Sequence, residues 1–465
     1  MPILELPFGI SVDFSFWSEV LNWPTPLLIR AVFAIVGWAI LILVFFYMGS
    51  ELWLDLKQSK FSKNWKWILL AIDIPPEQIQ SPKAVEQIFA QLSGALLVPN
   101  FGEKYWQGVK QKWFSFEIIS IEGYTQFLIY TESQFRDLVE AAIYAQYTTA
   151  EITEVEDYIS NVSSKFPNDT DDVLGVEFGL VSPDSYPIRT YQDFEHSVTL
   201  DATFNDPMAA ILETFSRIGA GEYFWTQIII QPSPNNWKET GIKLIKDIIA
   251  QKSGAKGPSV LSQVAALPVG VVAEFAKSIT SSPDAKPVIK KEPPTPKISD
   301  LTPGIKDTVA AIEEKIAKIG FFTKIRALYA ARKEVFNPSK CLEGFIGGLN
   351  QFHIQGRNGF VPKKFTSAHY AFKHYRTAEE KRKFVAAYKK RKLKVGRKPY
   401  ILNIEELATI WHFPLPLVKT PSLQKSSIKR SEPPINLPVE SFATPLKHKT
   451  EETKDELPPE EPMYG

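Results

Sequence analysis

The sequence is nearly without cysteine. Cys341 is the only cysteine among 465 residues. A single thiol excludes an intramolecular disulfide and a cysteine-rich zinc site, and it agrees with a reducing compartment for most of the chain. The 6 histidines are scattered, and His412, between Trp411 and Phe413, is interpreted as a packing residue rather than a ligand. We therefore expect no metal and no cofactor.

The signatures of several enzyme classes are also missing. A P-loop requires G-x-x-x-x-G-K-[ST], because backbone amides and a lysine surround the phosphates. Neither GAKGPS nor GEKYWQGVK has this spacing. There is no G-x-S-x-G elbow and no H-E-x-x-H motif. We therefore predict that the protein is not an enzyme; an unrecognised membrane-bound enzyme would need a pocket in which titratable groups converge.

A long uncharged run lies near the N-terminus. Residues 31–48, AVFAIVGWAILILVFFYM, contain no charged side chain and are long enough to cross the hydrocarbon core as a helix. A cleaved signal peptide fits less well, because no basic region precedes the run and no small-residue cleavage pattern follows it. A buried core helix is the other alternative. We predict a transmembrane helix over residues 26–50, after an extracytoplasmic N-terminus over residues 1–25.

The charges that flank this run predict its orientation. Acidic residues precede it, whereas four lysines follow it closely: Lys57, Lys60, Lys63 and Lys66. The positive-inside rule then places the C-terminal side in the cytoplasm. We expect a single-pass protein of the cytoplasmic (inner) membrane with its N-terminus outside and the bulk of the chain cytoplasmic.

The rest of the chain predicts an α+β fold in several parts. Residues 60–160 show the order β-α-β-β-α-β, which is the split βαβ or ferredoxin-like arrangement. Within this order, Glu122-Gly123 is a hairpin signal, and Thr131 with Gln134 is interpreted as a capping box. Residues 165–250 predict a second α+β unit that includes YPIRTY as a strand. A linker rich in Pro, Lys and Ser follows over residues 251–300, then a third α/β region over 301–415 and an extended or disordered tail over 416–465.

The third region contains a strongly basic helix in a chain whose net charge is only +1. Thr377 and Glu380 are interpreted as its capping box. Phe384, Val385 and Tyr388 form one narrow apolar face that should dock the helix. The predicted nucleic-acid or lipid-binding residues are the cations on its other faces: Lys381, Arg382, Lys383, Lys389, Lys390, Arg391, Lys392 and Lys394.

Three interpretations of these cations remain open. They can form an ordinary solvated helix face, since exposed charges contribute little to stability. They can bind a nucleic-acid backbone without sequence preference, because no base-reading motif is present. They can also meet anionic lipid headgroups or an acidic protein partner. Asn403 and Glu406 predict a capping box for a further short helix that Pro414 ends.

Several stretches of the chain resemble a known family. They include WFSFEIISIEGYTQFLIYTESQFRDLVEAAIYAQY, DPMAAILETFSRIGAGEYFWTQIIIQP, ILNIEELATIWHFP and SEPPINLP. The likeness spans about residues 27–438 and is to uncharacterised bacterial single-pass membrane proteins. The resemblance implies that such proteins are encoded with, or fused ahead of, DNA-translocating ATPases of the type IV secretion and conjugation kind. It implies no particular functional residue.

Topology, charge and resemblance together predict a non-enzymatic, membrane-anchored accessory or assembly subunit of a DNA-translocation machine. Its motor ATPase would be a separate protein, and the basic helix would contact a nucleic-acid backbone. The alternative is a membrane scaffold without nucleic-acid binding, in which the same helix contacts anionic lipid or an acidic protein.

Overall fold

The computed structural model describes residues 3–6, 10–13, 24–75, 80–195, 206–252, 302–368 and 372–414. Nearly all of the predicted linker and the whole predicted tail lie outside these residues. The chain divides into two compact units. The first comprises Met1–Trp65 and Leu97–Gln111, and the second comprises Lys66–Leu96 and Lys112–Gly465.

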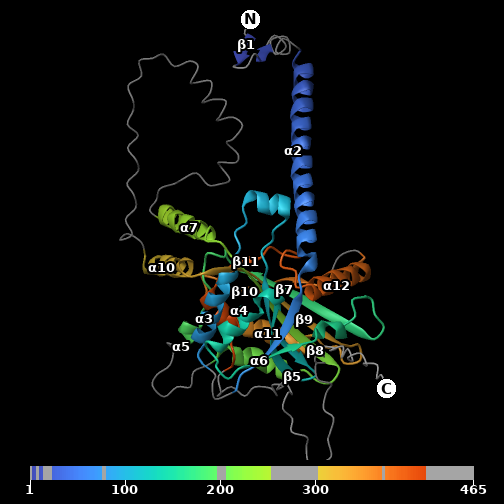
Figure 1. The fold of residues 1–465 in the computed structure, drawn as a ribbon, viewed down its shortest axis with the longest axis vertical. Helices are drawn as coiled ribbons and strands as arrows, with labels where there is room; N and C mark the ends of the chain where they lie inside the picture. Colours follow the sequence, from blue (N-terminus) through green and yellow to red (C-terminus); the bar gives the residue numbers. More distant parts are fainter. Residues whose placement is uncertain are drawn as a thin grey trace, which may run out of the picture. The chain divides into compact units, whose positions relative to one another are not determined.

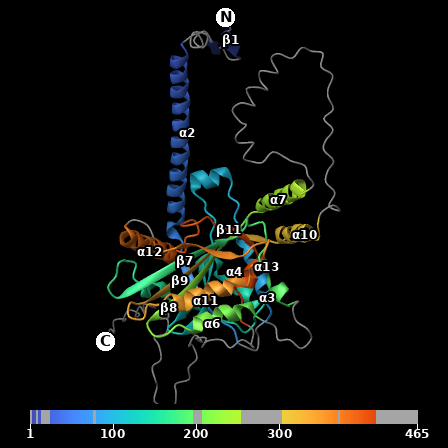
Figure 2. The same ribbon diagram turned by 180° about the vertical axis from the view of Figure 1, so that it is seen from behind.

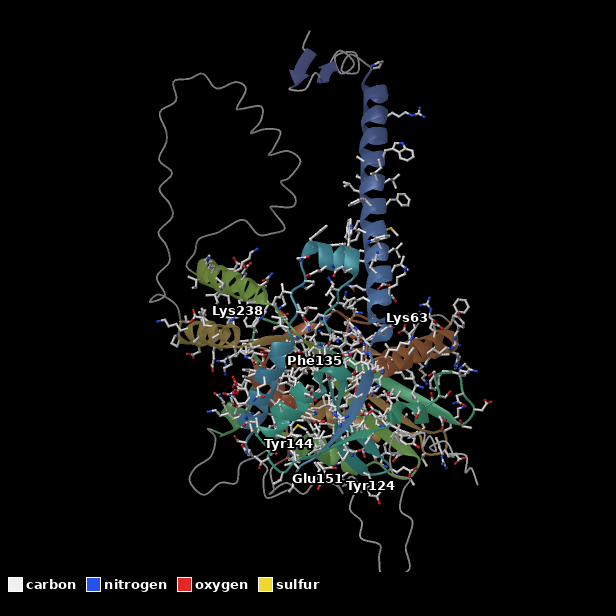
Figure 3. All side chains as sticks on the ribbon, in the orientation of Figure 1. Lys63, Tyr124, Phe135, Tyr144, Glu151 and Lys238 are labelled. Atoms are coloured by element: carbon white, nitrogen blue, oxygen red, sulfur yellow. The ribbon has the colours of Figure 1, made fainter. Side chains whose placement is uncertain are left out.

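The first unit is dominated by one long helix. β1 (Ile3–Leu6) and β2 (Ile10–Asp13) form an antiparallel pair, and α2 (Thr25–Phe61) follows with a proline in its first turn. A helix is present over the predicted range 26–50 and continues to Phe61, and the short helix η1 (Ser62–Asn64) follows it. Within the described side chains, Gly37–Asn64 is long and apolar enough to cross a membrane. Its side chains project outward around the helix (Figure 3).

The second unit contains one antiparallel sheet of nine strands. The order is β10-β7-β9-β8-β4-β5-β3-β6, with β11 paired to β9. The strands are β3 (Trp67–Asp73), β4 (Phe114–Ile121), β5 (Tyr124–Glu132), β6 (Glu151–Val155), β7 (Asp171–Leu180), β8 (Glu222–Pro232), β9 (Gly320–Arg332), β10 (Phe360–Phe365) and β11 (Tyr400–Asn403).

The predicted ferredoxin-like arrangement is confirmed in one half of this sheet. The chain order is β3-α3-β4-β5-α4-β6, with α3 (Pro82–Leu92) and α4 (Arg136–Tyr144), and the spatial order is β4-β5-β3-β6. The predicted hairpin turn has φ of 51° at Glu122 and 95° at Gly123, as a type I′ turn requires. The capping box predicted at Thr131 is wrong, because β5 continues to Glu132 and the Glu132 carboxylate accepts the N–H of Gln134 instead.

The other half repeats the same topology. Its chain order is β7-α6-β8-β9-α11-β10, with α6 (Pro207–Ser216) and α11 (Ser339–Asn350), and its spatial order is β10-β7-β9-β8. The regions predicted over 165–250 and 301–415 are therefore parts of one split βαβ half rather than separate units. Neither could form it alone, because β9 from the later region lies between β7 and β8 from the earlier one. β8 then pairs with β4 and joins the two halves.

The connections of this second half differ from the prediction in one strand. YPIRTY, residues 186–191, forms no strand, and α5 (Tyr191–Glu195) begins at its end. The excursion between β8 and β9 includes α7 (Trp237–Lys252) and α10 (Pro303–Ala317). These two helices pack together through a small apolar cluster that contains Ile245, Val309 and Ile312.

The two faces of the sheet are covered unequally (Figures 1 and 2). One face packs against α3, α4, α6, α11 and α13 (Ile404–Ile410), and it forms the larger apolar core. Trp411 lies in that core 4.8 Å from the ring of Phe116. The opposite face is covered by α12 (Lys373–Lys389) and by residues near Tyr158 and Phe166. The predicted basic helix is therefore one of the few elements over this second face.

Candidate functional site: a polar row and a basic groove

The basic helix begins earlier than the sequence predicted. α12 starts at Lys373 after Phe372, whose φ is 60°, so Thr377 lies inside the helix and does not cap it. The Thr377 hydroxyl instead accepts the backbone N–H of Ala368 at 3.1 Å. The predicted docking face is confirmed, because Phe384, Val385 and Tyr388 are all buried. A β-carbon at Gly175 of β7 would overlap the Phe384 ring, so this glycine lets the helix approach the sheet.

Three of the predicted cations hold α12 in place. Lys381 forms an ion pair with Asp172. Arg382 Nε donates to the carbonyl of Phe166 at 2.6 Å, and Lys389 Nζ donates to the carbonyl of Val162 at 2.8 Å. Four others are exposed: Lys383, Lys390, Lys392 and Lys394. Lys383 also pairs with Glu379 at 3.4 Å, but this pair is exposed and contributes little, so a ligand can reach all four of these ammonium groups.

Arg391 differs from both groups, because its side chain is fully buried. Arg391 Nε and Nη2 donate to the two carboxylate oxygens of Glu117 at 2.9 and 3.0 Å. Nη1 and Nη2 donate to the carboxylate of Asp157 at 2.6 and 3.1 Å. Burial alone would lower the pKa of the Arg391 guanidinium, but Glu117 and Asp157 raise it well above its ordinary value. Arg391 therefore connects the end of α12 to Glu117 and Asp157 in the interior, and it does not belong to the exposed basic surface.

Glu117 belongs to a row of polar side chains that crosses four adjacent strands. Glu117 of β4 lies opposite Gln227 of β8, Gln227 lies opposite Arg326 of β9, and Arg326 lies opposite Glu177 of β7. All four are buried. We call these residues the polar row. The sequence pattern did not predict this row, because its members become neighbours only when β4, β8, β9 and β7 pair in register.

One end of the polar row has more positive than negative charge. Glu177 lies 3.3 Å from Lys324 Nζ and 3.7 Å from Arg326 Nε. Arg326 Nη2 donates to the carbonyl of Val395 at 2.6 Å, and Nη1 to that of Ala387 at 3.4 Å. Arg326 Nε has no hydrogen-bond partner within the described part of the chain. Two buried cations thus face one carboxylate, which leaves a local excess of positive charge.

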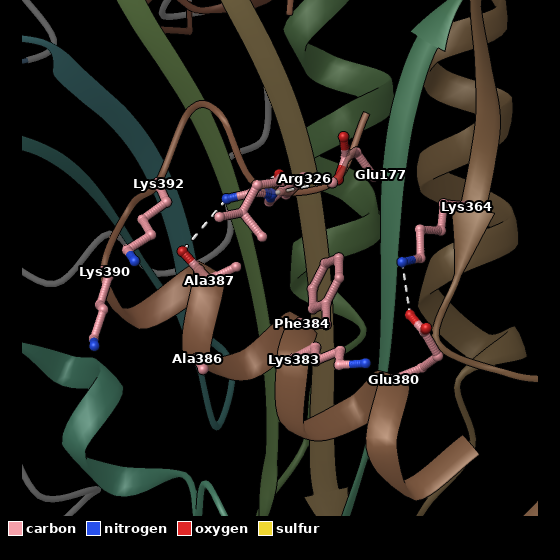
Figure 4. Close-up of a pocket in the computed structure, with 12 residues that line it drawn as sticks. Glu177, Arg326, Lys364, Glu380, Lys383, Phe384, Ala386, Ala387, Lys390 and Lys392 are labelled. Atoms are coloured by element: carbon pink, nitrogen blue, oxygen red, sulfur yellow. Dashed lines mark hydrogen bonds and ion pairs between the residues drawn. The ribbon is translucent and has the colours of Figure 1, made fainter. Parts of the chain in front are cut away.

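This end of the row opens into a groove of about 490 Å³ beside α12. We call it the basic groove. Its five cations are Arg326, Lys364, Lys383, Lys390 and Lys392, and its two carboxylates are Glu177 and Glu380. Figure 4 shows Arg326 next to Glu177, with Lys390 and Lys392 on one side and the Lys364 ion pair to Glu380 on the other. A concave site with this charge attracts anions, and phosphate is a chemically suitable one.

The match to a known family covers most of these features. Residues 103–426 match the family described as a domain of unknown function, DUF8128. The chain belongs to this family. No curated protein matches the sequence. The DUF8128 region contains α12, the whole polar row and all residues of the basic groove. It begins after α2 and after β3.

A prediction on pH follows from Lys324 in the DUF8128 sheet. Burial lowers the pKa of its ammonium to about 8, although Glu177 acts in the opposite direction. Because the unfolded chain keeps this proton to about pH 10.4, it binds more protons than the folded chain above pH 8, and stability rises with pH. We expect the wild type to gain about 1 kcal/mol over Lys324→Met between pH 8 and 9. Urea unfolding of both proteins at each pH measures this, and a constant difference would contradict it.

Proposed function

We propose that the protein is a non-enzymatic, membrane-anchored accessory subunit of a DNA-translocation machine. It docks a separate motor ATPase at the membrane and contacts a nucleic-acid backbone through the basic groove. The observation that supports this contact most strongly is the convergence of five cations from three parts of the chain on one groove. The resemblance to proteins encoded with type IV secretion ATPases supplies the context, and the family match is neutral on it.

The groove has a construction suited to phosphate. Arg326 is held by two backbone carbonyls at its base, whereas Lys383, Lys390 and Lys392 are exposed around it. The buried guanidinium adds positive potential at the base of the groove, and the flexible lysines at the rim can pair with phosphates directly. None of these contacts reads a base, so binding would be independent of sequence and sensitive to salt.

The anchoring part of the proposal rests on α2. Its apolar surface is long enough to cross a bilayer, and lysines follow the apolar run while acidic residues precede it. The N-terminus would then face outward and the nine-stranded sheet would lie in the cytoplasm, at the inner membrane. In the cytoplasm, the second unit would be accessible to a motor ATPase and to its DNA.

The test is DNA binding by the full chain in nanodiscs of phosphatidylcholine, a lipid without net charge. The full chain is required, because a fragment that begins after the linker would lack β7 and β8, the two neighbours of β9. The wild type is compared with a triple variant, Lys383→Gln, Lys390→Gln and Lys392→Gln. The matched control replaces three exposed lysines elsewhere in the second unit: Lys243→Gln, Lys246→Gln and Lys333→Gln.

We expect the groove variant to bind random-sequence duplex DNA at least about tenfold more weakly at 0.1 M salt, with a salt slope smaller by about 3. The control should lose much less than the groove variant. Equal losses in both variants would show that only net charge matters and would contradict a groove site. If the wild type binds vesicles that contain phosphatidylglycerol and does not bind DNA, the scaffold alternative replaces the proposal.

A further inference from the structure

The first unit contains a second element beside α2, the segment Leu97–Gln111 with the short helix η4 (Glu103–Gln107). Trp53 Nε1 of α2 donates to the carbonyl of Tyr105 at 2.9 Å. Gly108 has a φ of +77°, and a β-carbon there would overlap the backbone of Lys57. Only a glycine allows this approach in this backbone conformation. The segment is therefore fitted to one turn of α2, between Trp53 and Lys57.

The segment is a built structure rather than a loose connection. The N–H of Asn100 donates to the Glu103 carboxylate at 2.8 Å, and the N–H of Glu103 donates to the Asn100 side chain at 2.8 Å. This reciprocal pair resembles a capping box and satisfies two donors at the start of the helical turn. The rings of Phe101 and Tyr105 pack at 4.6 Å. The local fold is thus stabilised by its own polar groups.

Its apolar side chains nevertheless face outward. Val98 is 71% exposed, Phe101 72% and Trp106 68%. Leu52 and Leu56 on α2, which flank the contact with Tyr105, are exposed as well. The segment therefore exposes large apolar side chains next to polar ones such as Asn100 and Lys104. An exposed apolar surface of this kind marks an interaction site.

We propose that residues 97–107 enter the interfacial layer of the bilayer beside α2 and form a second membrane contact. This rests on the proposed anchoring by α2. The segment contacts α2 at Trp53 and Lys57, and both elements expose large apolar side chains. Trp53 lies five residues after Met48, about 7.5 Å further along the helix. Tryptophan prefers the headgroup level. Lys57 and Lys104, which lie over the rings of Trp53 and Tyr105, can reach anionic headgroups with their ammonium groups.

The bilayer is favoured over a protein partner by chemistry. The exposed residues of the segment combine aromatic rings and aliphatic groups with lysines, as interfacial membrane segments do. A bilayer interface accommodates both the aromatic and the cationic residues of the segment. A protein partner would instead have to compete with lipid for a surface that α2 already holds near the membrane.

Spin labels on the full chain test the proposal in nanodiscs of phosphatidylethanolamine and phosphatidylglycerol. The buried Cys341 is replaced by alanine, and one cysteine is introduced at a time: Phe101→Cys, Phe45→Cys as the lipid reference and Lys243→Cys as the water reference. Collisions of each label with oxygen and with a water-soluble nickel chelate measure its depth. We expect the label at position 101 to lie between the two references, with low nickel access and clear oxygen access.

Two results would overturn the inference while α2 remains in lipid. Nickel access at position 101 equal to that at position 243 would place the segment in water. Low access to both reagents would place it against protein. If the label at position 45 also met nickel freely, the anchoring by α2 would fail together with the inference, so the two failures are distinguishable.

Discussion

Arg391→Ala is expected to lower the free energy of unfolding by about 3–5 kcal/mol, because it leaves the buried carboxylate of Glu117 without its cation. Glu117 is fully buried beside Arg391 and also accepts from Ser115, Tyr158 and Gln227, at 2.6, 2.8 and 3.0 Å. These neutral donors cannot neutralise a buried charge. The same arginine lies 3.9 Å over the ring of Tyr130. Its loss therefore removes both charge pairing and packing between the end of α12 and the first half of the sheet.

Two controls separate this effect from a general loss at the end of α12. Lys390→Ala, next in the chain and exposed, should change stability by less than about 0.5 kcal/mol. The second control is the double variant Arg391→Ala with Glu117→Gln, which removes the unpaired buried charge and keeps a side chain of the same size. Urea unfolding should show the double variant to be more stable than Arg391→Ala alone, and an equal or larger deficit would contradict the buried-charge explanation.

The sequence revealed the first half of the sheet better than the second, for physical reasons. In the first half, β4 and β5 are joined directly by Glu122-Gly123, which favours a left-handed turn that matches the strand twist. In the second half, β8 and β9 pair across a long excursion that contains two helices, so nothing local indicates that they are neighbours. β10 has the sequence FVPKKF, in which a proline and two lysines weaken the strand signal.

The sequence predicted the positive charge of the candidate site but not which side chains form it. The density of cations after Lys373 indicates an anionic partner or solvent, but it does not tell which side chains turn inward. Arg391 has a φ of 44° just past the end of α12, which turns its side chain toward Glu117, 274 residues earlier in the chain. No spacing rule predicts such a pairing. The groove likewise needs Arg326 and Lys364, which lie on strands that the sequence did not pair with the helix.

Lys315→Met is the other substitution with a large expected effect, a loss of about 3–5 kcal/mol in the free energy of unfolding. Lys315 of α10 and Glu406 of α13 are both fully buried, with Nζ 2.9 Å from the nearer carboxylate oxygen. Glu406 also accepts the N–H of Ile188 at 2.9 Å and that of Asn403 at 2.9 Å. Asn403 and Glu406 form the predicted capping box, so one carboxylate both caps α13 and holds α10.

A double-mutant cycle decides whether the two residues act as a pair. Glu406→Gln keeps a side chain able to accept hydrogen bonds but leaves the buried Lys315 charge without its partner. Lys315→Met leaves the buried Glu406 charge without its partner. The double variant contains no unpaired buried charge. Its loss in free energy of unfolding, measured with urea, should therefore be smaller than the sum of the two single losses by about 1–3 kcal/mol. The exposed pair Arg217 and Glu213, whose charged atoms are 3.9 Å apart, serves as the control and should show coupling below about 0.5 kcal/mol. Additive losses at Lys315 and Glu406 would mean that each is held by its backbone partners alone, and that the attachment of α10 to α13 does not depend on their charges.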